Sequence, residues 1–187
     1  MPPRSLSRIP LAEMNPLLSD YLAPRVARLG YLGEFFQCAA HQPDALLAFQ
    51  RFTDAAKGGL SDKIIETVAL TAAQVMDNRY ERHQHERLSV RLGFGRPWVA
   101  EVVALGTAPA SAMTPDEVLV QRFVIRALET RGHDAGSLFG EIVEALGADQ
   151  AIAVLMVLGR YAVHALVVNT LRLAAPVPSI FEDGFDA

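Results

Sequence analysis

The sequence predicts an all-α protein. No stretch shows the alternating apolar and polar residues of a half-buried strand, whereas apolar residues recur at helical spacing, most clearly over 60–93 and 149–173. At 187 residues, 51% of them hydrophobic and 20% charged, the chain is long enough for one core and marginal for two domains. We therefore expect a single helical domain over 17–175, an extended N-terminal arm over 1–16 and a C-terminal tail over 176–187.

The first part of the chain predicts short helices interrupted by proline and glycine. Four prolines within residues 1–16 deny that stretch a regular helix. Residues 17–29 are expected to form a helix broken near Pro24, and residues 32–41 a second short one. A third helix is expected over 43–57, because it opens with proline and aspartate and stops at two glycines. The residues expected to form its buried stripe are Leu46, Leu47, Phe49 and Phe52.

The middle of the chain, residues 60–93, carries the strongest helical pattern. Ser61 is a suitable N-cap, and Asp62 lies in the first turn, where the helix dipole favours a carboxylate. Asp77 and Asn78 are residues that often interrupt helices, so a kink or tight turn is expected there before a second helix. The apolar residues expected to bury one face of the first helix are Ile64, Ile65, Val68, Ala69, Ala72, Ala73 and Val75.

The second half of the chain contains the clearest helix boundary. Thr114 is followed by proline, aspartate and glutamate, which combine an N-cap, a proline at the first helical position and a capping box. Shorter helices are expected over 97–105 and 137–146. A long, mostly buried helix is expected over 149–173, and Trp98 is expected to pack in the core.

Composition excludes several classes of partner. The net charge of −4, with no cluster of Lys or Arg among aromatics, argues against nucleic acid. A single cysteine, Cys38, excludes an internal disulfide and suits a reducing compartment. The N-terminus lacks the apolar core of a signal peptide, and the longest apolar stretch, 151–168, contains Arg160 and His164. We therefore expect a cytoplasmic protein that binds no nucleic acid and no membrane.

Proton-handling side chains concentrate in the strongest helical region. Glu81 and His85 are four residues apart and so share one helix face, whereas His83 points elsewhere and is expected to be solvent-facing or at an interface. Glu66 lies at the edge of the buried face of the preceding helix, where a carboxylate needs a partner. These residues are the candidates for function.

Their spacing resembles that of a known superfamily. Glu66, Asn78, Glu81 and His85 stand at offsets 0, 12, 15 and 19, followed by small and apolar residues and Gly93. This resembles the carboxymuconolactone decarboxylase and alkylhydroperoxidase D-like (AhpD-like) superfamily. Residues 60–93 carry the specific part of the match. The resemblance implies an all-helical bundle that assembles into trimers or hexamers.

The chain departs from the thiol peroxidases of that superfamily at the two positions where they carry cysteine. Those positions are Asn78 and Glu81 here, and neither can do thiol chemistry. Cys38 lies outside the motif without a resolving partner, so a two-cysteine peroxidase mechanism is not supported. The chain is more similar to the cysteine-free members, including decarboxylase-type lyases.

These residues favour acid–base chemistry without a cofactor. We expect a lyase or isomerase that acts on a small carbonyl-containing acid or lactone, with His85 as general acid/base. Glu81 is expected to orient it or exchange protons with it, and Glu66 to be a relay partner. Tyr80 or Asn78 could donate to a substrate oxygen. Burial is expected to raise the carboxylate pKa values unless a charged histidine or a shared proton counteracts it.

Several alternatives remain open at this stage. The cluster could be a structural polar network in a non-catalytic oligomeric binding protein. Peroxide reduction has weaker support. Binding of a divalent metal by Glu66, Glu81 and His85 also has weaker support. The polar residues of the last long helix, Arg160, Tyr161 and His164, could reach an anionic substrate but are expected more often to serve core or intersubunit hydrogen bonds. The side chains expected to make surface i,i+4 pairs are Arg82, Glu86 and Arg87.

Overall fold

The computed structural model describes residues 6–107 and 111–182, so the outer ends of the expected arm and tail lie outside the described residues. It divides into two compact units, Met1–Asp54 and Ala55–Ala187. Every regular element in the described ranges is helical, which confirms the predicted all-α class. The elements that begin in the first unit are η1 (Leu11–Glu13), α1 (Pro16–Leu29), α2 (Glu34–Ala39) and α3 (Pro43–Lys57). The second unit contains α4 (Asp62–Val75), α5 (Arg79–Arg91), α6 (Gly95–Val103), α7 (Pro115–Glu129), α8 (Gly136–Leu146) and α9 (Ala148–Leu171).

The first unit differs from expectation at three places. Within the stretch expected to be an extended arm, η1 forms a short 3₁₀ turn, and Asn15 then caps α1. The expected break near Pro24 is wrong, because α1 continues through it. Proline removes only one backbone hydrogen bond of the helix, and the buried Leu18 and Leu22 hold its inner face in place. On α3 the expected stripe is partly correct, since Leu46 and Leu47 are buried but Phe52 is 40% exposed.

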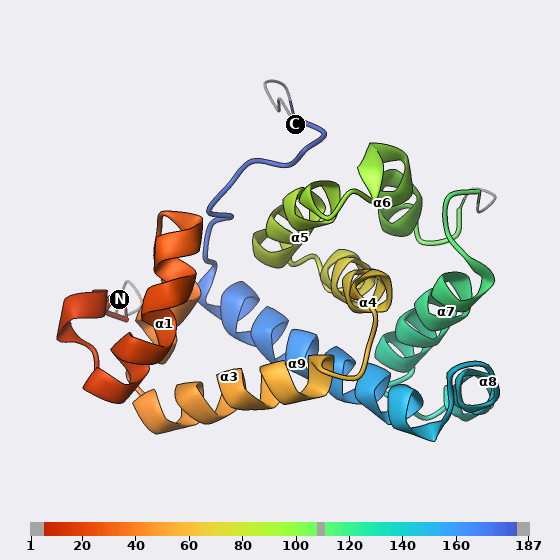
Figure 1. The fold of residues 1–187 in the computed structure, drawn as a ribbon, viewed down its shortest axis with the longest axis horizontal. Coiled ribbons are helices and arrows are strands. Elements are labelled where there is room, and N and C mark those ends of the chain that lie inside the picture. Colours follow the sequence, from red (N-terminus) through yellow and green to blue (C-terminus); the bar gives the residue numbers. More distant parts are fainter. Residues whose placement is uncertain (1–5, 108–110, 183–187) are drawn as a thin grey trace, which may run out of the picture. The chain divides into compact units, whose positions relative to one another are not determined.

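Helix α4 lies at the centre of the second unit. It packs against α5, α7 and α9, and Figure 1 shows these helices around it. Every residue from Ile64 to Ala73 is buried, so α4 is covered on all sides rather than on one face. Polar groups on such a helix need partners within the protein.

The turn between α4 and α5 occurs where the sequence predicts it. Ser61 accepts a hydrogen bond from the Ile64 amide at the start of α4. Asp77 then adopts a left-handed conformation with φ of 48°, and the Asn78 side chain caps α5 by accepting from the Glu81 amide at 3.1 Å. The tight turn sets α5 against α4 and brings their polar faces together.

Helix α7 begins at Pro115, with the predicted capping box formed in both directions between Thr114 and Glu117. Glu117 also accepts a 2.9 Å hydrogen bond from the indole of Trp98, which is 1% exposed. The capping residue Glu117 of α7 is therefore hydrogen-bonded to a buried tryptophan of α6.

Helix α9 is long and apolar enough to cross a membrane by length and composition alone, a test that core helices of soluble proteins also pass. It packs against α4 and α8 and buries Arg160 and His164. These contacts and the two buried polar residues are those of a core helix. The large apolar side chains on its opposite face are exposed: Ile152, Leu155, Met156, Val163 and Leu166.

The segment after α9 packs onto the outer side of α5, where the sequence predicted surface side chains. Glu86 is 1% exposed and accepts hydrogen bonds from Ser179 Oγ at 2.5 Å and from the Ile180 amide at 3.1 Å. His83 is 6% exposed, with Nδ1 3.1 Å from the Val177 carbonyl oxygen. The expected i,i+4 pair of Glu86 with Arg82 does form, at 3.3 Å, but Glu86 is buried rather than at the surface. The solvent-facing alternative for His83 is wrong, because this segment covers its side chain.

Candidate active site

Three helices bring polar side chains together inside the second unit. Helix α4 contributes Glu66, and α5 contributes Glu81 and His85, which lie one turn apart. Helix α9 contributes a further set on one buried stretch: Arg160, Tyr161 and His164. The predicted catalytic residues Glu66, Glu81 and His85 thus converge, each 2–7% exposed.

The closest contact in the cluster joins Glu66 to His85. His85 Nδ1 lies 2.8 Å from Glu66 Oε2, which also accepts a 3.1 Å hydrogen bond from Ser89 Oγ. A carboxylate is an acceptor, so Nδ1 carries the proton and the other ring nitrogen, Nε2, is left to accept or exchange one. Glu66 therefore fixes the orientation and the tautomer of His85.

Among the described residues, His85 Nε2 lies near polar groups from two helices. Tyr161 Oη lies at 3.2 Å, and Glu81 Oε2 lies farther away at 3.5 Å. The Tyr161 ring stands edge-on to the imidazole, with 5.2 Å between ring centroids and an interplanar angle of 82°. The hydroxyl of Tyr161 is thus the nearer hydrogen-bonding partner of the reactive nitrogen.

Glu81 is held as an anion by the groups around it. Its Oε1 lies 2.5 Å from Arg160 Nη1 and 3.3 Å from His164 Nε2. Burial by itself raises the pKa of Glu81, but His164, Arg160 and His85 together outweigh burial and hold that pKa well below its usual range. The exception stated for a charged histidine therefore applies to Glu81, and Arg160 lowers its pKa further.

The two predicted substrate-binding residues lie beside the cluster. The Asn78 side chain both caps α5 and places Nδ2 3.4 Å from His164 Nδ1, so its amide is used within the protein. The Tyr80 ring packs 5.7 Å from the His164 ring and is 3% exposed. A substrate contact by either residue stays a prediction.

The sequence did not predict the members of the cluster that α9 supplies. Arg160, Tyr161 and His164 were expected to serve core or intersubunit hydrogen bonds, and the structure pairs them with Glu81 and His85 within one chain. Their spacing of one, three and four residues within the otherwise apolar stretch 151–168 was the available signal, because buried polar groups on one face need a common partner.

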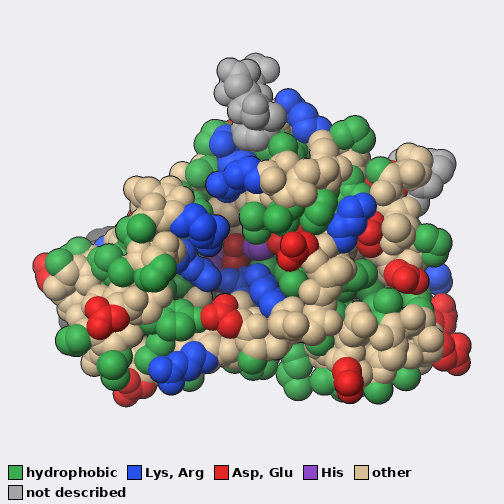
Figure 2. All heavy atoms as spheres, viewed as in Figure 1, with side chains coloured by type: hydrophobic (Ala, Val, Ile, Leu, Met, Phe, Trp, Pro, Cys, Tyr) green, Lys and Arg blue, Asp and Glu red, His purple; other side chains and the backbone are tan. Residues whose placement is uncertain are grey.

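The surface near these helices is hollowed. Figure 2 shows a depression towards the middle of the view, with a histidine and an acidic side chain visible at its floor. In Figure 1 the same region lies between α5 and α9. These are the helices that carry Glu81, His85 and His164, and His85 keeps 7% of its surface exposed.

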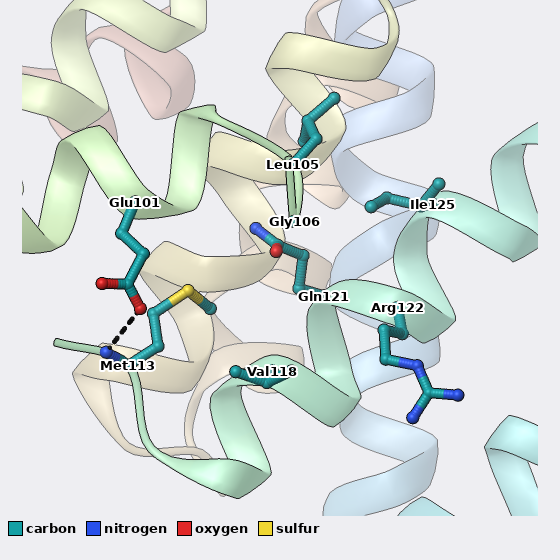
Figure 3. Close-up of a pocket in the computed structure, with 8 residues that line it drawn as sticks. All are labelled: Glu101, Leu105, Gly106, Met113, Val118, Gln121, Arg122 and Ile125. Carbon is teal, nitrogen blue, oxygen red and sulfur yellow. Dashed lines mark hydrogen bonds between the residues drawn. The ribbon is translucent and has the colours of Figure 1, made fainter. Parts of the chain in front are cut away.

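A separate pocket lies elsewhere in the second unit. Its volume is about 220 Å³, and Figure 3 shows Gln121 and Val118 of α7 facing Glu101 of α6 across it. Glu101 is occupied in holding the loop before α7, since it accepts hydrogen bonds from the backbone amides of residues 111–113. None of Glu66, Glu81 and His85 lines this pocket.

The described residues contain no group of three or more His, Cys, Asp or Glu side chains arranged to hold a metal ion. In the cluster Glu66 and Glu81 approach different nitrogens of His85, and Oε1 of Glu81 is taken up by Arg160. What the arrangement offers chemically is a buried imidazole between a carboxylate and a phenol.

Solved structures with the same fold were found by comparison, whereas no protein-family model and no curated protein matches the sequence. An AhpD core protein from Ralstonia eutropha, an uncharacterized peroxidase-related protein, is 20% identical over 94% of each chain, with a TM-score of 0.76. The debrominase Bmp8, in complex with 2,3,4-tribromopyrrole, is 13% identical over 92% of this chain and 91% of its own, with a TM-score of 0.78.

A third structure, a protein of unknown function from Agrobacterium tumefaciens and a candidate AhpD-type antioxidant defence protein, is 17% identical. The match covers 75% of this chain and 96% of that one, with a TM-score of 0.65. At these identities the likeness shows the fold, which is the AhpD-like helical fold that the motif predicted.

Proposed function

We propose, on the premise of an AhpD-like helical fold, that the chain is a cofactor-free lyase or isomerase with His85 as its general acid/base. The substrate class is a small carbonyl-containing acid or lactone. The observation that carries the proposal is the 2.8 Å contact between Glu66 Oε2 and His85 Nδ1. It directs the exchangeable nitrogen of His85 away from Glu66 and towards the groups of α5 and α9.

The chemistry requires an imidazole that can change its protonation state in place. Decarboxylation or isomerisation beside a carbonyl forms an enolate-like anion, and a proton must then be delivered to or removed from carbon. Glu66 accepts the hydrogen bond from Nδ1 of His85 whether or not Nε2 carries a proton. The ring therefore gains and loses its proton at Nε2 without turning.

Glu81 serves this site as a fixed charge. Since its pKa lies below the usual range, it carries no proton to donate near neutral pH. Its negative charge instead aligns Arg160 and His164 and lies 3.5 Å from His85 Nε2. This differs from an exchange role for Glu81 and leaves proton transfer to His85.

The size of the substrate is proposed by analogy. The debrominase with this fold was solved with 2,3,4-tribromopyrrole, a small planar ring. That complex supports a ligand of similar size here, although the chains are only 13% identical.

Peroxide reduction is the second candidate activity, because one structural neighbour is described as peroxidase-related and another as an antioxidant defence protein. The residues oppose it, because the chain has one cysteine and Cys38 belongs to the first unit, outside the motif. Consumption of hydrogen peroxide that survives Cys38→Ser would show peroxide chemistry independent of a thiol.

A non-catalytic role is favoured by one observation. The cluster residues pair with one another and are nearly buried, as in polar networks that only join helices. A protein of that kind binds or assembles without turnover.

We further propose a cytoplasmic homo-oligomer, a trimer or hexamer. The exposed apolar side chains on α9 support self-association, and light scattering on Leu166→Lys would test it.

The decisive experiment is solvent deuterium incorporation followed by NMR. The wild-type protein in D₂O is given a γ-carboxylated butenolide, a β-oxo acid and a 2-oxo acid, and carbon-bound deuterium and released CO₂ are measured. His85→Ala should lower the rate by about 100-fold or more. His83→Ala is the matched control, because His83 lies on the same helix but bonds to Val177 on its other side. A folded His85→Ala variant with the wild-type rate would refute the proposal.

A further inference from the structure

We propose that the hydroxyl of Tyr161 is the catalytic group that passes the proton between His85 and the substrate. The inference rests on the function proposed above and adds a residue from α9 to it. Three features of the cluster carry it: the position of Nε2, the fixed anion at Glu81 and the cations beside the phenol.

The first two features leave one proton carrier next to His85. Nδ1 is occupied by Glu66, so the exchangeable proton of His85 uses Nε2. The neighbours of Nε2 are Tyr161 Oη at 3.2 Å and Glu81 Oε2 at 3.5 Å. Glu81 is an anion whose other oxygen is taken by Arg160, whereas a phenol keeps its proton at neutral pH. Tyr161 is therefore the neighbour that can deliver a proton.

The surroundings of the Tyr161 ring suit a phenol that ionises transiently. The guanidinium carbon of Arg160 lies 4.3 Å from the ring centroid, and Lys57 Nζ lies 5.4 Å from it. Both positive charges stabilise a phenolate more than a phenol.

The same contacts indicate where the substrate binds. Lys57 is partly exposed, whereas Tyr161 and Arg160 are 2% and 5% exposed. Among these three residues the lysine is therefore the one nearest to solvent. We place the substrate on the Lys57 side of Tyr161, where an ammonium group would also attract a carboxylate.

The proposed step is balanced without an external oxidant or reductant. Loss of CO₂ from a carboxylated lactone breaks a carbon–carbon bond and leaves its electron pair in an enolate. The enolate carbon forms a C–H bond with the proton of Tyr161. The resulting phenolate takes the Nε2 proton of the His85 imidazolium, and solvent then returns a proton to His85.

The test removes the hydroxyl and keeps the ring. Tyr161→Phe should retain the edge-on packing on His85 but lower deuterium incorporation into the γ-carboxylated butenolide by about 100-fold, chiefly through kcat. Thr71→Val is the matched control, because it also removes one buried hydroxyl, on α4, and Thr71 bonds to Gln121 rather than to the cluster. Circular dichroism confirms that each variant is folded.

A second variant separates proton transfer from a structural role. Site-specific 3-fluorotyrosine at position 161 keeps shape and hydrogen bonding but makes the phenol more acidic, so the alkaline limb of the pH–rate profile should move to lower pH. A wild-type rate for Tyr161→Phe, or an unmoved limb, would overturn the role of Tyr161 and leave His85 catalysis standing. If the wild-type protein turns over none of the three probes, the proposed function fails and this inference fails with it.

Discussion

Replacing Glu81 by glutamine should destabilise the second unit strongly, because it removes the nearest counter-charge of the buried guanidinium of Arg160. Arg160 is 5% exposed, and its Nη1 lies 2.5 Å from Glu81 Oε1. Glutamine has nearly the same shape, so the substitution removes charge and little packing. The effect therefore measures the electrostatic role of the carboxylate.

The magnitude follows from the geometry of the pair. At 2.5 Å and an effective dielectric constant of about 20, two unit charges attract by roughly 6 to 7 kcal/mol. Part of this attraction only compensates for the cost of desolvating the Glu81 carboxylate, and the glutamine variant no longer has that cost. A loss of about 3 to 5 kcal/mol in the free energy of unfolding remains, as for other broken buried pairs. For a chain of this length that corresponds to a fall in Tm of about 6 to 20 °C.

Urea unfolding followed by tryptophan fluorescence measures the stability of the second unit, which contains the Glu81–Arg160 pair. Trp98 is the single tryptophan of the chain, is buried and belongs to the second unit. A double-mutant cycle with Arg160→Met should show a coupling energy of at least about 2 kcal/mol, since removing both charges leaves neither uncompensated. Glu144→Gln on the exposed side of α8 is the control and should change stability by less than about 0.5 kcal/mol.

A loss below about 1 kcal/mol for Glu81→Gln would refute this reasoning, as would additive effects of the two single variants. Either result would mean that Arg160 is satisfied by other groups or by water. The description of Glu81 as a fixed counter-charge would then be wrong, and its assignment in the proposed mechanism would have to be withdrawn.

Three further predictions concern stability. Thr114→Ala breaks the capping box of α7 and should cost about 1 kcal/mol in the same urea assay. Glu86→Ala removes the acceptor of Ser179 and of the Ile180 amide, so hydrogen exchange at Ile180 should accelerate clearly; unchanged exchange would show that apolar packing alone holds the segment. Because the pKa of Glu81 is lower in the folded than in the unfolded chain, its contribution is present above its ordinary value of 4.5 and is lost as pH falls below it. Wild-type stability should therefore decline in that acid range more steeply than that of Glu81→Gln; parallel pH profiles would contradict the assignment.

Helix boundaries were predictable where one residue supplies the cap. The capping box at Thr114 and the N-cap at Ser61 both form, because their partners lie within one turn of the chain. The expected break at Pro24 failed for the opposite reason. Whether a helix continues past a proline depends on the packing of its other residues, which no local pattern shows.

In the candidate site, too, the sequence predicted local relations but not contacts between distant segments. Glu81 and His85 share a helix face by spacing alone, and the motif offset linked them to Glu66. Their partners on α9 are nonlocal, so the sequence showed that polar residues were present there but not which groups they meet. The low pKa of Glu81 could not be predicted for the same reason, because the groups that lower it include Arg160 and His164 on α9.

The pairing of α5 with α9 also constrains the order of events during synthesis. Glu81 leaves the ribosome 79 residues before Arg160, so for that interval a carboxylate destined for the interior lacks its partners Arg160 and His164. Until then burial of Glu81 is opposed by its desolvation, and α4 and α5 cannot close over it at low cost. The nascent second unit should therefore remain open to chaperones until α9 has emerged, and docking of that helix should complete the core and the candidate site in a single event.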